Sequence, residues 1–135
     1  MPIANLPRTA LAAFSADIAR DFACDVLRAA GVVSVLPSGG GRDAMATAQT
    51  NPVDIIVTDW PENDIALGEF VQSLRNGNRV GRDTPVVLLT AREGRADLDA
   101  ARAAGVSAVV VKPVSAALLK HRLAAMVTKA RRRAL

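Results

Sequence analysis

The sequence contains no tyrosine, one tryptophan, one histidine and one cysteine among its 135 residues. A single cysteine excludes an internal disulfide, and no other cysteine or histidine accompanies Cys24 in a reactive pattern, so we expect a buried structural thiol. His121, between Lys120 and Arg122, is expected to be a surface residue. With so few aromatic side chains, the core is expected to consist of valine, isoleucine, leucine and closely packed alanine.

The sequence also lacks any apolar run of the roughly 20 residues that a membrane-spanning helix requires. The apolar stretch at residues 11–16 is too short for a convincing signal peptide. We therefore expect a cytoplasmic protein with no membrane association. Half of the residues are hydrophobic, and the length fits one domain, which we assign to residues 1–127. Residues 128–135 form a basic extension of the last predicted helix.

Short β-branched runs alternate along the chain with alanine-rich segments of helical spacing. This alternation predicts an α/β fold with a doubly wound parallel sheet in three layers, of (βα)5 topology. The predicted strands are 8–13, 32–36, 53–59, 85–90 and 108–111, and the predicted helices are 17–30, 42–49, 66–75, 95–104 and a last one that Ser115 caps. In the first helix, the residues expected to face the core are Ile18, Phe22, Ala23, Val26, Leu27 and Ala30.

Three of these strands are followed or closed by a polar group. Asp59 ends the third strand, Thr90 closes the fourth, and Lys112 follows the fifth. Parallel strands deliver such groups to one crevice at the carboxyl edge of the sheet. There a carboxylate can accept a phosphoryl group, while a hydroxyl and an ammonium hold its oxygens. The sequence therefore predicts a phosphoryl-transfer site.

Asp59, Thr90 and Lys112-Pro113, in this order, resemble the receiver domain of bacterial two-component response regulators, and residues 105–108 sit where that family turns into its fifth strand. The resemblance covers nearly the whole chain. It implies a stand-alone, chemotaxis-regulator-like module with the flavodoxin-like receiver fold. It further implies that Asp59 is the phosphoacceptor and that Thr90 and Lys112 sense the phosphoryl group. The implied partners are a histidine kinase or phosphotransfer protein, and a target on the face of helix 4, strand 5 and helix 5.

The chain departs from this family at the metal site. Receivers end the first strand in two adjacent acids that hold Mg²⁺ together with the phosphoacceptor, whereas here the positions carry Phe14 and Ser15. We expect weak Mg²⁺ binding, since few carboxylates remain to displace the waters of the ion. Asp59 and Asp17 remain as candidate ligands. The interpretation that we favour makes Ser15 the cap of the first helix and places Asp17 in its first turn.

Two further departures follow Asp59. Proline stands at Pro61, earlier than in the family, and Glu62 and Asp64 are either substitute ligands or, as we prefer, part of an ordinary polar loop. Val109 occupies a position where many receivers place an aromatic side chain that couples phosphorylation to the output face. Its absence weakens the usual switching mechanism.

The C-terminal segment concentrates positive charge at Lys129, Arg131, Arg132 and Arg133 in a chain of net charge +4. The interpretation that we favour is a solvated helix end, where cations are stabilised by the helix dipole. The alternatives are an acidic partner surface, an anionic ligand such as cyclic di-GMP, or weak nucleic-acid binding. DNA ranks last because the sequence offers no recognition helix.

Two function classes therefore remain open. One is a non-enzymatic single-domain response regulator that is phosphorylated at Asp59 and signals by protein–protein interaction. The other is a pseudo-receiver that binds its partner or an anion without phosphorylation. A hydrolase that uses Asp59 as nucleophile is a distant third, because a second acid is missing. The sequence leaves the oligomeric state open.

Overall fold

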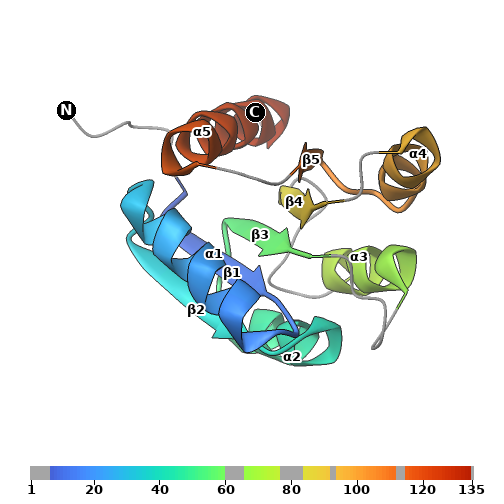
Figure 1. Cartoon of the computed structure of the whole chain (residues 1–135), viewed down its shortest axis with the longest axis horizontal. Helices are drawn as coiled ribbons and strands as arrows, with labels where there is room; N and C mark the ends of the chain where they lie inside the picture. Colours follow the sequence, from blue (N-terminus) through green and yellow to red (C-terminus); the bar gives the residue numbers. More distant parts are fainter. Residues whose placement is uncertain (1–6, 60–65, 77–83, 92–93, 112–114, 135) are drawn as a thin grey trace.

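A computed structural model describes residues 7–59, 66–76, 84–91, 94–111 and 115–134, with side chains as far as residue 126. Five strands alternate with five helices in these ranges (Figure 1). The elements are β1 (Thr9–Ala13), α1 (Asp17–Ala29), β2 (Ser34–Ser38), α2 (Gly41–Thr50), β3 (Ile55–Thr58), α3 (Leu67–Arg75), β4 (Val86–Thr90), α4 (Arg95–Ala103), β5 (Ala108–Val111) and α5 (Ala116–Ala134). The predicted alternation of strands and helices is confirmed.

All strand pairs are parallel, and the strand order is β2-β1-β3-β4-β5. This is the flavodoxin-like doubly wound order that the sequence predicted. The helices α1 and α5 pack on one face of the sheet, and α2, α3 and α4 pack on the other. The predicted three layers are therefore present. The inner strands β3 and β4 are buried along their whole length and are apolar except for the threonine that ends each, because both of their faces are covered.

The predicted inward stripe of α1 is wrong for two of its members. Ile18 and Phe22 are 87% and 51% exposed, whereas Ala23 and Leu27 are buried. At about 100° per residue, the buried side chains span one arc of the helix, and Ile18 and Phe22 lie roughly 90° or more from its centre. The apolar stripe predicted from the sequence was too wide. In the structure, two large apolar side chains of α1 lie on the surface.

The second strand begins two residues later than predicted. Gly31, at φ 104°, ends the turn after α1, and the N–H of Val32 donates to the carbonyl of Leu27. Val32 therefore belongs to the end of the helix, where glycine allows the left-handed conformation. Pairing starts only at Ser34, opposite Thr9.

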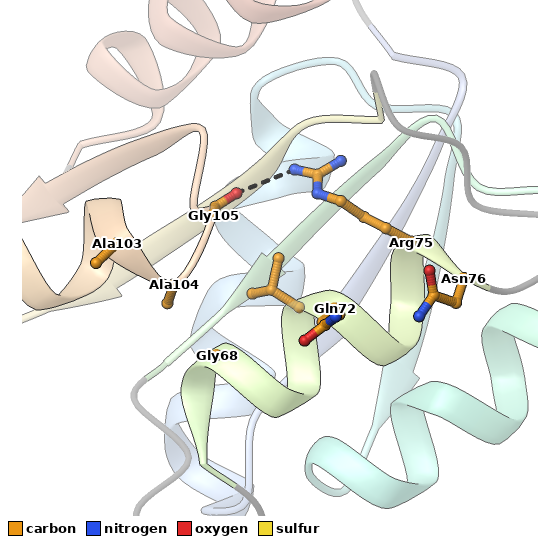
Figure 2. A pocket seen from close by; sticks show the side chains of 8 residues that line it. Gly68, Gln72, Arg75, Asn76, Ala103, Ala104 and Gly105 are labelled. Carbon is orange, nitrogen blue, oxygen red and sulfur yellow. Dashed lines mark hydrogen bonds between the residues drawn. The ribbon is translucent and has the colours of Figure 1, made fainter.

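Arg75 joins three segments on the side of the sheet that carries α3 and α4. Its guanidinium donates to the carbonyl of Thr84 at 2.8 Å and to that of Gly105 at 3.1 Å. Figure 2 shows it at one end of a hollow of about 660 Å³ between α3 and α4. Gly68 lines it from α3, the helix that carries Arg75, and Ala103 and Ala104 line it from the end of α4. Gly68, Ala103 and Ala104 are too small to fill the hollow. The two hydrogen bonds of Arg75 therefore help to hold α3 against the segments that precede β4 and β5.

Replacing Arg75 with methionine is expected to lower the free energy of unfolding by about 2 kcal/mol, because hydrogen bonds to a charged group contribute more than neutral ones. Chemical denaturation measures the change. Arg102→Met, at an exposed position of α4, is the matched control and should change stability by less than about 0.5 kcal/mol. Equal effects of the two substitutions would show that the Arg75 contacts do not hold these segments together.

Candidate functional site

Asp59 and Thr90 lie at the carboxyl edge of the sheet, as their positions in the sequence predicted. Asp59 directly follows β3 and is half-buried, and Thr90 is the last residue of β4 and is 5% exposed. Thr58 pairs with Leu88, so the next residue, Asp59, is level with Leu89 on the neighbouring strand. Thr90 lies one residue further along that strand. Val111 pairs with Thr90, but the following Lys112 lies outside the described residues. Two of the three predicted groups thus meet at one edge.

Thr58 fixes the backbone that carries Asp59. Its buried hydroxyl donates to the carbonyl of Ala13 at 2.9 Å and lies 3.1 Å from the carbonyl of Asp59. The hydroxyl therefore ties the ends of β1 and β3 together next to the backbone of Asp59. Sequence reasoning missed this role. The available signal was a polar residue closing an otherwise apolar buried strand, since such a hydroxyl requires a partner.

Phe14 and Ser15 place no carboxylate at the end of β1. The ring of Phe14 is 1% exposed and belongs to the apolar cluster beneath α1 and α5, while its N–H donates to the carbonyl of Ser38. Ser15 is exposed, and the predicted cap is wrong because Ala16 holds the cap position of α1 with no side-chain hydrogen bond. Asp17 does lie in the first turn, as predicted.

Arg20, which the sequence analysis did not single out, reaches back over the end of β1. Its Nη1 donates to the carbonyl of Phe14 at 3.2 Å, and its Nη2 to Oδ1 of Asp17 at 2.5 Å. The spacing of three between Asp17 and Arg20 was a sequence signal for this ion pair. The candidate ligand Asp17 therefore has an arginine as its partner at this edge.

The residues that the structure describes do not fit a magnesium ion. No group of three acidic, histidine or cysteine side chains gathers in the described ranges, and the end of β1 offers no carboxylate beside Asp59 to displace the waters of the ion. A guanidinium occupies the neighbourhood of the absent acidic pair. Glu62 and Asp64, the other carboxylates considered from the sequence, lie outside the described ranges.

The basic C-terminal residues continue α5, whose backbone is helical to Ala134. The side chains of Lys129 and Arg131–Arg133 lie outside the description, so their predicted anion binding stays a prediction. In the described part of the chain, no helix has the length and apolar character to cross a membrane.

Cys24 is buried on α1, as predicted, and His121 is exposed on α5. Burial raises the pKa of the Cys24 thiol above its ordinary value of 9.0, and Arg28 opposes this only in part. We expect alkylation by iodoacetamide at pH 8 to be at least about tenfold slower in the folded than in the urea-unfolded protein, since the thiolate is the nucleophile.

The same shift predicts a pH dependence of stability. Burial raises the pKa of the Cys24 thiol in the folded protein above that in the unfolded chain. The contribution of the neutral thiol to the free energy of unfolding is therefore fully present below pH 9.0 and is lost as the pH rises through the folded pKa. The free energy of unfolding of Cys24→Ala, measured by denaturation across this range, should fall less steeply with pH than that of the unaltered protein. Identical slopes would contradict the assigned burial.

Comparison with known proteins agrees with this architecture. Residues 16–124 match the family model of the response regulator receiver domain. Chemotaxis protein CheY of Pseudomonas aeruginosa is 28% identical over 99 residues, which are 73% of this chain and 79% of that protein. Chemotaxis protein CheY1 of Helicobacter pylori is 29% identical over 94 residues, covering 69% of this chain and 75% of that protein.

Solved structures show the same fold. Chemotaxis protein CheY4 of Vibrio cholerae superposes with a TM-score of 0.78 at 26% identity, covering 87% of this chain and 97% of that one. The receiver domain of a Pseudomonas aeruginosa sensor histidine kinase, solved with a magnesium ion in its active site cleft, gives 0.79 at 21% identity, covering 90% and 98%. With the family match over most of its length, this chain belongs to the response regulator receiver domains, which are modules of two-component signalling.

Proposed function

We propose that this chain is a response regulator receiver that accepts a phosphoryl group at Asp59 from a histidine kinase or phosphotransfer protein. The observation that carries the proposal is the position of Asp59, a half-buried carboxylate at the carboxyl edge of the sheet, beside Thr90. Asp54, at the other end of β3, instead accepts hydrogen bonds from the amides of Arg8 and Thr9. Of the two aspartates that flank this strand, only Asp59 stands at the ligand-binding edge.

The chemistry at this edge is a single displacement at phosphorus. A carboxylate oxygen of Asp59 forms a bond to phosphorus, while the bond from phosphorus to the donor imidazole nitrogen breaks. The nitrogen keeps the electron pair of the broken bond and takes up one proton from solvent, so the donor side chain leaves as neutral imidazole. Thr90 and Lys112 are proposed to hold the oxygens of the bound phosphoryl group and thereby to sense it.

Acetyl phosphate followed by intact-mass measurement tests the proposal. The protein should gain one phosphoryl group, and Asp59→Asn should gain none. Asp54→Asn is the matched control, because it changes the aspartate at the opposite end of the same strand and keeps an acceptor oxygen there. An unmodified wild-type protein, with and without Mg²⁺, would contradict phosphoacceptance. Modification that persists in Asp59→Asn would place it elsewhere.

The exposed apolar pair Ile18 and Phe22 is proposed to contact the donor protein. Both lie on α1, which begins at the carboxyl edge of the sheet, so a protein that presents phosphohistidine to Asp59 passes beside them. Replacing both with serine should slow transfer from a phosphorylated histidine kinase by about thirtyfold, since two apolar side chains that each contribute about 1 kcal/mol give about 2 kcal/mol together.

Acetyl phosphate separates this docking role from the chemistry. Transfer from the small donor should be unchanged in the double variant, because acetyl phosphate makes no contact with the outer face of α1. The rate constants are read from radiolabel transfer and from intact mass. Equal loss with both donors would show that the substitutions disturb the phosphoacceptor edge rather than a docking surface.

The output of the module is proposed to be a protein target bound by the face of α4, β5 and α5. Val109 on β5 is half-buried, and no aromatic side chain is available there to report phosphorylation. We therefore propose that a shift of Thr90 on phosphorylation is passed to β5 through Val111, with which Thr90 pairs. The alternative, a pseudo-receiver that binds an anion such as cyclic di-GMP through its basic tail, has no described contact in its favour.

A further inference from the structure

The guanidinium of Arg20 lies across the ends of two strands at the phosphoacceptor edge. It contacts the carbonyl of Phe14, which follows β1, and its Nη1 lies 3.9 Å from the position that a Cβ on Gly39 would take, directly after β2. The side chain is 22% exposed, so it is largely covered while one side remains open to solvent. Asp17, its ionic partner, is 83% exposed.

Strand register relates this guanidinium to Asp59. Ala13 of β1 pairs with Thr58 of β3, and Phe14 and Asp59 are the next residues of the two strands. Neighbouring strands are about 4.8 Å apart. The backbone of Phe14 is thus roughly one strand spacing from that of the phosphoacceptor. The guanidinium itself lies toward β2, near Gly39, so it has to turn across the end of β1 to meet a phosphoryl group on Asp59.

The charge at this position has the opposite sign from that of an acidic pair. A guanidinium repels a divalent cation and attracts phosphoryl oxygens, whose geometry matches its planar set of donors. Arginine has five N–H donors, and among the residues described, the contacts with Phe14 and Asp17 engage two nitrogens. Donors remain for an anion. The ion pair with Asp17 can be exchanged for it, because Asp17 is 83% exposed and solvent screens the attraction.

We infer that Arg20 neutralises the phosphoryl group at Asp59 in the role that a metal ion has in other receivers, so that phosphoryl acceptance here needs no divalent cation. Asp17 is then the resting partner of the guanidinium, which an arriving anion displaces. This inference rests on the proposed function, since it assumes that Asp59 is the acceptor. It adds a binding group and removes a cofactor requirement.

Phosphorylation by acetyl phosphate in EDTA, followed by intact mass, is the first arm of the test. The wild-type rate should change less than about twofold on adding excess Mg²⁺, and Arg20→Ala should be slower by about tenfold to a hundredfold, as expected for one charge-assisted contact. Arg20→Lys should retain part of the rate, because it keeps the charge without the fork. Arg28→Ala, an exposed arginine in the last turn of the same helix, is the matched control and should match the wild type.

Inorganic phosphate, titrated in EDTA and followed by amide NMR, is the second arm and needs no covalent step. Phosphate should shift the amides after β1 and β3, and its affinity should fall about tenfold or more in Arg20→Ala. Asp17→Asn should bind at least as tightly as the wild type, since it removes a competitor for the guanidinium. Melting temperatures of all variants establish that they are folded.

The two arms separate this inference from the proposed function. Phosphorylation at Asp59 that requires Mg²⁺ and is indifferent to Arg20 would overturn the inference and leave the proposed function standing. If no donor phosphorylates Asp59, the proposed function fails, and Arg20-dependent phosphate binding would still establish an anion site. Phosphate binding that is absent, or unchanged in Arg20→Ala, would overturn the anion site as well.

Discussion

Phe14→Ala is expected to lower the free energy of unfolding by about 3–5 kcal/mol, the usual cost of deleting a buried phenylalanine ring. The ring is 1% exposed and packs in the apolar cluster that includes Leu27 and Leu119 beneath α1 and α5. The cluster is built largely of alanine and valine on the β1 side, so few side chains can collapse into the space. Urea denaturation of the purified variant measures the loss.

Phe22→Ala provides the matched control for this prediction. It deletes the same ring from the neighbouring helix, but from a side chain that is 51% exposed, so the expected change is within about 1 kcal/mol. A loss for Phe14→Ala no larger than that for Phe22→Ala would show that Phe14 does not support the core. Its place in the sequence, where other receivers have an acid, would then need an explanation other than packing.

The sheet was the most predictable part of this fold. β4 and β5 are short β-branched runs that must be buried on both faces, and their bounds follow from composition with an error of at most one residue. β2 was less predictable because it is an edge strand with polar ends and Pro37, which is tolerated only at such an edge. The hydrogen bond from Val32 to Leu27 moved its start, and no local propensity encodes that bond.

The site was predictable only where a residue ends a strand. Asp59 and Thr90 follow from strand position and parallel topology, which together place strand ends at one edge. The contacts of Arg20 and Thr58 depend on side-chain direction across that edge, which sequence spacing does not determine. For the same reason Ser15 was taken as a cap, although the helix begins one residue too late for its hydroxyl to bond there.

The burial of Phe14 also limits how an acidic pair could be restored. A carboxylate at position 14 would enter an apolar cluster, where an unpaired charge costs several kcal/mol, so Phe14→Asp should unfold the domain rather than create a metal ligand. Position 15 is different because Ser15 is exposed at the end of β1. Only this position can accept an acid without loss of the core.

Ser15→Asp is therefore expected to strengthen Mg²⁺ binding by about tenfold, because affinity for this ion rises with the number of carboxylate oxygens offered to it. Isothermal titration calorimetry at constant ionic strength measures the affinity. Asp17→Asn should leave Mg²⁺ binding unchanged if Asp17 serves Arg20 rather than a metal. Loss of binding in Asp17→Asn would make Asp17 a displaced ligand. If Ser15→Asp alone has no effect but gains affinity once Arg20→Ala is added, the guanidinium itself excludes the ion from this edge.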